Sequence, residues 1–244
     1  MSVVDEVPPA GDPPGHRGSA GGRHALRIGA RTLGEVLLTT GVVVMLFVAY
    51  QLVWTNVQAD RAAEANTQDL IQKWQGSPAD PEFDLPLERG KPFALLYIPR
   101  LGASYRVPIV EGISLASLAE GVGHYPETAL PGEIGNFSVA GHRATNGEPF
   151  AYLDQLREGD DVVVETSTNW YTYEVYDEQI VQPTQVDVIL PVPGEPLAKP
   201  TASLMTLTTC NPRWASYERL IFHAKLVDQQ PTSLGEKPPA LGRG

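Results

Sequence analysis

The chain has 244 residues, of which 42% are hydrophobic, and its formal net charge is −11. This length suits one sizeable folded domain with appendages, and the acidic balance argues against nucleic-acid binding. The single cysteine excludes an internal disulfide, and the sequence holds neither metal-ligand spacings nor a glycine-rich phosphate loop, so we expect no metal and no cofactor.

The N-terminal part combines a polar tail with an apolar segment. Residues 1–32 begin rich in Pro, Gly and Ala and carry scattered arginines, which predicts a disordered cytoplasmic tail. Residues 33–54 are mainly apolar, and at about 1.5 Å per residue they span roughly 33 Å, enough for the core of a bilayer. Arginines precede this segment and acids follow it, so the positive-inside rule places the N-terminus in the cytoplasm. The pattern predicts a single-pass anchor with the remaining chain outside the cytoplasm.

A cleaved signal peptide is the alternative for this segment, with Val57-Gln58-Ala59 as the cleavage site. The apolar run is longer than that of usual signal peptides, which favours a retained anchor. Residues 55–90 are predicted to form a helical stalk and a linker, because 58–75 have helical composition and 76–86 are rich in proline and acids. We expect this segment to hold the next domain off the membrane.

The folded domain is predicted over residues 91–228, and its pattern is one of short strands between turn signals. The predicted strands are 93–98, 105–110, 136–140, 161–166, 170–181, 203–209 and 220–227. A short helix is predicted at 114–120, helical turns at 149–156 and a proline-rich connection at 183–200. Such a series indicates an all-β fold, a closed or nearly closed barrel. Residues 229–244 are polar with prolines and glycines, and are predicted to be a disordered tail.

A candidate thiol site emerges at the ends of three of these strands. Cys210 ends one strand, because Pro212 cannot donate to a ladder. Arg219 opens the next strand, and a hairpin-like return brings it beside the sulfur. His142 ends another strand, directly after a glycine. One cysteine, one histidine and one arginine at strand ends predict an acyl-transfer site with a thiol nucleophile.

Each of these residues also has an ordinary structural explanation. A lone cysteine is more often a small buried hydrophobe than a nucleophile. A histidine beside a glycine is commonly a turn residue, and an arginine that starts a strand is commonly a solvated edge charge. The residues taken singly therefore do not decide the function, and their sequence context does.

That context resembles the sortase family over residues 94–227. The order of His142, then Thr206-Leu207-Thr208-Thr209-Cys210, then Arg219 is specific to it. The run His124-Tyr125-Pro126, together with Asn211-Pro212 after the cysteine, looks most like the class E sortases of actinobacteria. Further segments that carry the resemblance are Ile98-Pro99-Arg100-Leu101-Gly102, Val107-Pro108-Ile109-Val110-Glu111-Gly112, Ala129-Leu130-Pro131-Gly132-Glu133-Ile134-Gly135-Asn136 and Ala140-Gly141-His142-Arg143.

The resemblance implies a closed eight-stranded sortase-type β-barrel with short helices. It implies that Cys210 is the nucleophile, that His142 exchanges protons with the leaving and incoming amines, and that Arg219 holds the substrate backbone or the oxyanion. Whether the histidine acts on the thiol as a cation or as a neutral base stays open. The candidate substrate-binding residues are Thr208, Thr209, Tyr125 and His124, although a packed role is favoured for His124 and a strand role for both threonines.

The implied reaction is transpeptidation at the outer surface of the membrane. Its partners are secreted proteins with a C-terminal sorting signal, Leu-Ala-Xaa-Thr-Gly or similar, cleaved between Thr and Gly through a thioacyl intermediate. The acceptor is an amine on a lipid-linked peptidoglycan precursor. Two alternatives remain at this point: a membrane-anchored cysteine peptidase whose acyl-enzyme is resolved by water, and a non-catalytic surface β-domain with a buried Cys210. The Ser-His-Gly-Cys context of an L,D-transpeptidase is absent from the sequence.

Overall fold

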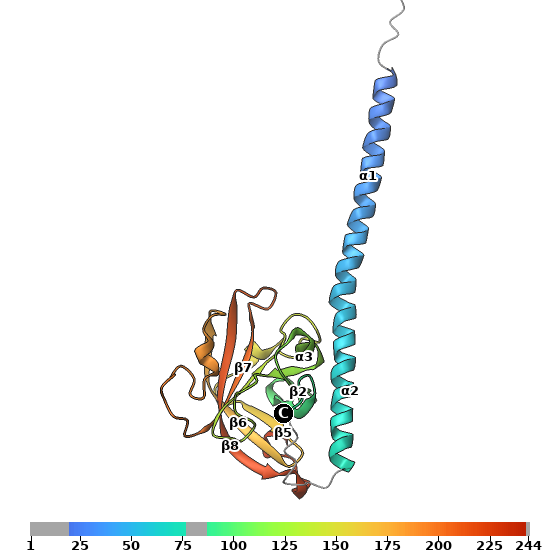
Figure 1. The fold of residues 1–244 in the computed structure, drawn as a ribbon. Coiled ribbons are helices and arrows are strands. Elements are labelled where there is room, and N and C mark those ends of the chain that lie inside the picture. Colours follow the sequence, from blue (N-terminus) through green and yellow to red (C-terminus); the bar gives the residue numbers. More distant parts are fainter. Residues whose placement is uncertain (1–19, 77–86, 243–244) are drawn as a thin grey trace, which may run out of the picture. The chain divides into compact units, whose positions relative to one another are not determined.

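A computed structural model describes residues 20–76 and 87–242. The chain divides into two compact units, with the division between Ala49 and Tyr50. The first unit is the helix α1 (Ala20–Ala49). The second unit holds a π-helical turn (Tyr50–Trp54), the helix α2 (Thr55–Gly76) and a β-barrel (Figure 1).

Helix α1 is apolar over most of its length, and its residues Leu26–Ala49 are long and apolar enough to cross a membrane. The helix starts at Ala20, so residues 20–32 are helical rather than disordered as predicted. Arg31 and Glu35 form an ion pair of 2.8 Å one turn apart, which is one reason why the helix extends beyond the apolar segment. The last five residues of the predicted span 33–54, Tyr50–Trp54, form a π-helical turn, and the predicted disorder of residues 1–19 lies outside the described residues.

Eight strands close into a barrel in the order β1-β2-β3-β4-β7-β8-β6-β5, which confirms the predicted fold. Neighbouring strands are antiparallel except for the parallel pairs β2–β3 and β4–β7. The strands are β1 (Pro92–Tyr97), β2 (Arg106–Glu111), β3 (Val122–His124), β4 (Gly135–Ala140), β5 (Asp161–Glu165), β6 (Asn169–Val181), β7 (Ser203–Asn211) and β8 (Glu218–Pro231).

The barrel core follows the two-residue period of its strands. In β7, Met205 and Leu207 are buried in the main apolar cluster together with Phe137 of β4 and Phe222 of β8. Each such side chain contributes about 1.5–3 kcal/mol when it is fully buried. Because successive side chains of a strand point to opposite faces, Cys210 belongs to the outer set of β7. The sequence alternation thus places the thiol on the outside of the barrel wall.

The C-terminal end of the chain differs from the prediction. Strand β8 runs on to Pro231, and two short 3₁₀ helices follow, Thr232–Leu234 and Pro239–Gly242. Ala240 is buried against Val163 and Trp170. Residues 229–242 are therefore structured rather than disordered, because a small apolar contact, which has no periodic signature in the sequence, fastens them to the barrel.

Helix α2 packs on the barrel, although the sequence predicted a stalk that holds the domain away from the membrane. It contacts β1, β2 and the helix α3 (Leu115–Glu120). Ala59 and Leu70 of α2 are buried, and the side-chain amide of Asn66 donates to Glu120 Oε2 at 2.7 Å. Helix α2 is thus part of the folded unit and includes Gly76, whereas the rest of the predicted linker, residues 77–86, lies outside the described part of the chain.

Candidate active site

Three neighbouring strands, β4, β7 and β8, bring the predicted catalytic residues to one end of the barrel. In the antiparallel pair β7–β8, Cys210 lies directly opposite Arg219. In the parallel pair β4–β7, Ala140 lies opposite Thr208, and each chain continues two residues to His142 and to Cys210. The cysteine strand therefore has the arginine on one side and the histidine on the other.

Backbone and side-chain hydrogen bonds fasten the histidine segment to the cysteine strand. The amide of Gly141 donates to Thr208 O at 3.1 Å, and the Thr209 hydroxyl donates back to Gly141 O at 2.8 Å. Because these bonds flank His142 and Cys210, they fix the spacing of the two residues at the level of the main chain.

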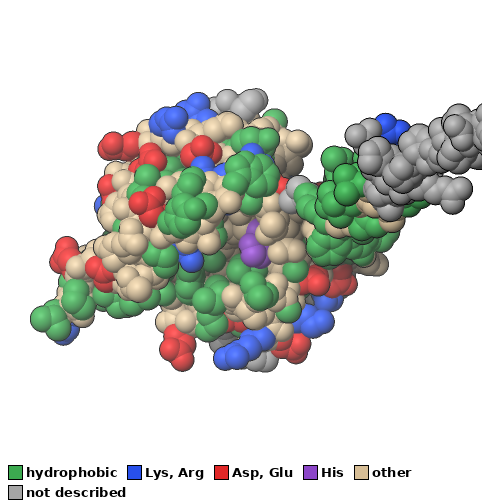
Figure 2. Space-filling model, turned by 90° about the horizontal axis from the view of Figure 1, so that it is seen from above, with side chains coloured by type: hydrophobic (Ala, Val, Ile, Leu, Met, Phe, Trp, Pro, Cys, Tyr) green, Lys and Arg blue, Asp and Glu red, His purple; other side chains and the backbone are tan. Residues whose placement is uncertain are grey.

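Cys210 is partly exposed and forms no disulfide. Figure 2 shows one face of the molecule on which hydrophobic and uncharged side chains occupy the middle, with a histidine among them, and charged side chains lie mostly toward the edges. Among the histidines whose side chains are described, His142 is partly exposed, while His124 and His223 are buried. The partial exposure of Cys210 argues against the alternative of a β-domain with a sealed thiol.

His142 lies at the start of the loop after β4. Burial lowers the pKa of its imidazole below the usual histidine value. The side-chain amide of Asn146 lies 3.3 Å from His142 Nε2, and the amide of Phe150 donates to His142 O at 2.9 Å. With an amide N–H facing Nε2, the remaining ring proton is assigned to Nδ1. The histidine is thus held as a neutral imidazole near pH 7.

We expect His142 to titrate below about pH 6.5, the ordinary histidine value. The imidazole of the unfolded chain takes up its proton at a higher pH than that of the folded chain. The free energy of unfolding therefore decreases as the pH falls from about 6.5 through the lower pKa of the folded state. An NMR titration of the full chain in detergent micelles follows the Hε1 resonance of His142 and gives the midpoint. The variant His142→Asn identifies the resonance, and the urea-unfolded chain supplies the reference midpoint. A midpoint at or above the unfolded value would contradict the effect of burial.

Arg219 is anchored by its own loop. Its Nη1 donates to Ser216 O at 3.1 Å and to Glu218 O at 2.8 Å. These bonds use one nitrogen of the guanidinium and orient the plane of the group beside the cysteine strand. The planar fork of an arginine can hold such an anchor and a second acceptor at once.

Arg143 is a residue of the site whose contacts the sequence did not predict. It is buried, and its Nη1 donates to Cys210 O at 3.3 Å and to Asn211 Oδ1 at 2.7 Å. Its Nη2 lies 3.0 Å from Asp154 Oδ2. Arg143 thus fixes the backbone of the cysteine strand. In the sequence, only its position directly after the candidate histidine indicated that Arg143 could belong to the site.

A second arginine ties the loop after Cys210 to helix α2. Arg213 pairs with Glu148, which also accepts a hydrogen bond of 2.6 Å from the side-chain amide of Asn56. Asn56 Oδ1 accepts in turn from the amide of Gly147 at 3.2 Å. The Glu148 carboxylate therefore joins three segments: the first turn of α2, the loop after His142 and the loop after Cys210.

Two of the predicted substrate-binding residues lie at the site. Burial raises the pKa of the Tyr125 phenol, and the nearby hydroxyl of Thr208 and the charge of Arg219 oppose this effect. Tyr125 therefore lies within electrostatic reach of the arginine and of Cys210. The hydroxyl of Thr208 is buried beside the Tyr125 phenol, and among the described residues no hydrogen bond to it has ordinary geometry. Tyr125 and Thr208 thus lie together next to Cys210 and Arg219.

The other two predicted substrate-binding residues are closed to direct contact with a peptide. His124 is 1% exposed, and both of its ring nitrogens face partners inside the fold. Thr209 is 2% exposed, and its hydroxyl is used on Gly141 O. Their side chains bond within the fold, which agrees with the packed role favoured for His124 and the strand role favoured for Thr209.

Comparison with known proteins assigns the family. Residues 96–227 match the model of the sortase domain. The chain is 35% identical over 239 residues to sortase SrtE2 of Streptomyces coelicolor, covering 91% of this chain and 92% of that protein. It is 41% identical over 222 residues to sortase SrtE1 of the same species, covering 88% of this chain but 61% of that longer protein. The structure of sortase E from Streptomyces avermitilis is 45% identical, with a TM-score of 0.57 over 63% of this chain and 99% of that one.

The barrel and its cysteine site thus define a protein of the sortase family, the family of cysteine transpeptidases, and the chain belongs to it. Within the family, the named relatives and the solved structures place it with the class E sortases.

Proposed function

We propose that this chain is a membrane-anchored transpeptidase that acts on secreted proteins with a C-terminal sorting signal, Leu-Ala-Xaa-Thr-Gly or a close variant. It cleaves the signal between Thr and Gly and joins the new carboxyl end to an amine of a lipid-linked peptidoglycan precursor. The observation that carries this proposal is that Arg219 lies opposite Cys210 in the pair β7–β8, while His142 follows the end of β4, which pairs with β7 on its other side.

The first half of the reaction forms a thioester. The thiolate of Cys210 attacks the carbonyl carbon of the signal's threonine, and a tetrahedral oxyanion forms. Arg219 and a backbone N–H near Cys210 stabilise this charge as it develops. His142 then gives a proton to the departing glycine amine, the peptide bond breaks, and the acyl group remains on the sulfur. Because burial lowers the pKa of His142, its protonated form is the minor one at pH 7.

The second half of the reaction transfers the acyl group. Neutral His142 accepts a proton from the incoming amine as the nitrogen attacks the thioester carbonyl. The carbon–sulfur bond breaks, a new amide forms and the thiolate returns. Water in place of the amine would give hydrolysis, so the outcome depends on which nucleophile reaches the thioester first.

The substrate class is supported by a solved relative. The structure of sortase E1 from Streptomyces coelicolor, 42% identical to this chain, carries a tripeptide in its active site. In this chain Tyr125 lies in the same neighbourhood as the thiol, with Thr208 beside it, and we assign both residues to peptide contacts.

Membrane attachment is assigned to α1. Leu26–Ala49 is long enough to span a bilayer, basic residues precede it, and acids follow it. This arrangement corresponds to a cytoplasmic N-terminus and an extracytoplasmic barrel. An anchor is physically reasonable for such an enzyme, because both of its proposed substrates are themselves held at the membrane.

A peptide assay of the full chain in detergent tests the proposal. A fluorescent Leu-Ala-Xaa-Thr-Gly peptide is incubated with and without a primary amine, and the products are resolved by mass spectrometry. We expect ligated product only with the amine, and neither cleavage nor ligation by Cys210→Ala, because that variant has no nucleophile. Hydrolysis alone in both reactions would support a peptidase, and no turnover with an unreactive Cys210 would support a non-catalytic domain.

A further inference from the structure

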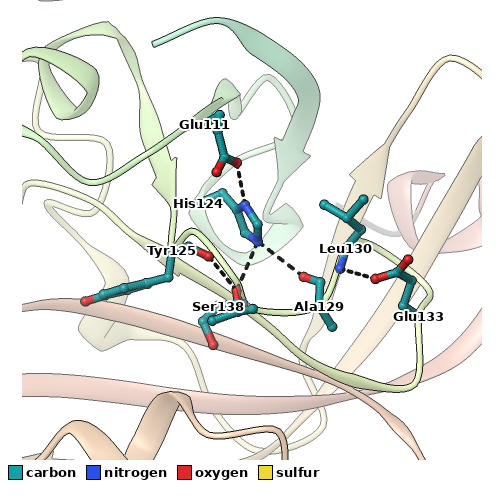
Figure 3. Close-up of polar contacts among 8 residues, drawn as sticks. Glu111, His124, Tyr125, Ala129, Leu130, Glu133 and Ser138 are labelled. Carbon is teal, nitrogen blue, oxygen red and sulfur yellow. Dashed lines mark hydrogen bonds and ion pairs between the residues drawn. The ribbon is translucent and has the colours of Figure 1, made fainter. Parts of the chain in front are cut away.

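A buried acid–histidine pair lies behind the site and has no part in the chemistry described so far. His124, the last residue of β3, has its Nδ1 2.6 Å from Oε2 of Glu111, the last residue of β2 (Figure 3). On the other side of the ring, Nε2 lies 3.0 Å from Thr128 Oγ1 and 3.3 Å from Ala129 O. The rings of Phe93 and Phe137 lie against the imidazole, with centroid distances of 5.7 and 5.3 Å.

The partners of Nε2 determine where its proton lies. A backbone carbonyl only accepts, and the one proton of the Thr128 hydroxyl is donated to Tyr125 O at 2.8 Å. The same hydroxyl accepts from the amide of Ser138 at 3.3 Å. Both groups facing Nε2 are therefore acceptors, and Nε2 must carry a hydrogen.

The partner of Nδ1 then fixes the charge of the pair. Nδ1 faces only the Glu111 carboxyl at 2.6 Å, so one further proton lies between the nitrogen and the oxygen. The pair is then an imidazolium with a carboxylate, or a neutral imidazole with a carboxylic acid, and its net charge is zero in both forms. The interior of a protein tolerates such a pair, because its net charge is zero and its polar atoms are hydrogen-bonded. Removal of either partner leaves the other as a buried polar group without its hydrogen bond.

This pair holds the turn that carries Tyr125. The amide of Tyr125 donates to Ser138 O at 2.9 Å, its carbonyl accepts from Thr128, and Thr128 in turn contacts His124. Within the turn Glu127 has φ 70°, a left-handed conformation that disfavours residues other than glycine. Surrounding contacts have to maintain such a backbone. Figure 3 shows the imidazole between Glu111 and this turn.

We propose that Glu111 and His124 are positioning residues: they set the turn 125–128 and thereby the place of Tyr125 beside Cys210 and Arg219, without touching the peptide. The part of this inference that concerns the peptide rests on the proposed function; the part that concerns the turn does not. Because Cys210, His142 and Arg219 lie on other strands and loops, loss of the pair affects peptide binding and leaves the thiol chemistry in place.

Two variants test the proposal in the full chain in detergent. His124→Gln removes the second ring nitrogen, and Glu111→Gln keeps the shape of the acid while removing its charge. The matched control is His223→Gln, which breaks another buried histidine bond, the 2.9 Å contact with Thr206 Oγ1. Thermal unfolding of all three variants measures the general effect of losing a buried hydrogen bond.

Hydrogen–deuterium exchange measures the turn itself and does not depend on activity. We expect amides over residues 122–134 to exchange about tenfold faster in both test variants, since their opening free energy falls. Exchange over residues 203–211 should stay unchanged, and His223→Gln should leave the turn protected. Unchanged exchange over 122–134 in a folded Glu111→Gln variant would overturn the proposal, whether or not the peptide is a substrate.

Kinetics with the sorting peptide test the consequence for binding. We expect KM to rise about tenfold and kcat to stay within about twofold, the signature of lost uniform binding. The rate of Cys210 alkylation by iodoacetamide should match that of the unaltered chain. A fall in kcat with KM unchanged, or slower alkylation, would assign the pair to the thiol site instead and would contradict a role in positioning Tyr125. If His124→Gln does not fold, Glu111→Gln decides alone.

Discussion

Arg219→Lys is expected to lower kcat/KM for transpeptidation by about 10²–10³-fold, the usual effect of removing an oxyanion donor. The guanidinium lies opposite Cys210 in the β7–β8 register and is already tethered through Nη1 to Ser216 O and Glu218 O. A lysine keeps the positive charge but has one nitrogen. It cannot hold the two loop carbonyls and also bond an oxyanion with the same fixed geometry.

Steady-state kinetics with a sorting peptide and an amine acceptor measure this effect. Arg100→Lys is the matched control, because Arg100 likewise makes two guanidinium hydrogen bonds, both to the Asp160 carboxylate, on the exposed surface. We expect the control to retain full activity, and both variants to unfold within a few degrees of the unaltered chain. Near-normal turnover of Arg219→Lys would remove this arginine from the mechanism.

Arg143→Met is expected to destabilise the barrel by about 3 kcal/mol, the usual scale for losing hydrogen bonds from a buried charged donor. The change leaves Cys210 O and Asn211 Oδ1 without the guanidinium that now bonds both of them. For a chain of this size, that loss corresponds to a melting temperature lower by about 6–12 °C. Activity should fall as well, because the backbone of the nucleophile is no longer fixed.

Differential scanning calorimetry of the full chain in detergent measures the melting temperature. The matched control is Arg157→Met, whose guanidinium bonds the carbonyls of Asp154 and Leu156 near the surface, and which should change stability by less than about 0.5 kcal/mol. Equal melting temperatures for the two variants would show that the buried contacts of Arg143 do not contribute to stability.

Local sequence patterns predicted seven of the eight strands and missed β3, which is only three residues long. They also placed Cys210 and Arg219 at strand ends, and the catalytic roles of Cys210, Arg219 and His142 stay predictions. A run of mostly apolar or β-branched residues predicted β7, whose residues 205–209 are buried on both faces, and the proline at 212 marks the end of the cysteine strand. The pairing of Cys210 with Arg219 needs only a hairpin, so its spacing is readable from the sequence. The family motif supplied His142, which no local pattern would have connected to the thiol.

Contacts between distant residues were not predictable in the same way. Arg143 bonds a residue 67 positions later, and Asn56 bonds one 92 positions later. The partner of His124 is an acid 13 positions earlier on a parallel neighbour strand. Such pairs depend on strand order and register, which a single sequence does not specify. The structured end of the chain was missed for a similar reason, because Ala240 is one small residue packing on strands formed much earlier.

The parallel pairing of β4 with β7 has a consequence for when the enzyme becomes active during synthesis. The cysteine and the arginine share a hairpin and can meet as soon as both strands exist. The pairing of β4, which precedes His142, with β7 requires by contrast that the long segment containing β5 and β6 closes into a loop. Such non-local contacts form slowly. We therefore expect the thiol of a folding chain to meet the arginine before the histidine, so that the complete site forms only when β4 has paired with β7.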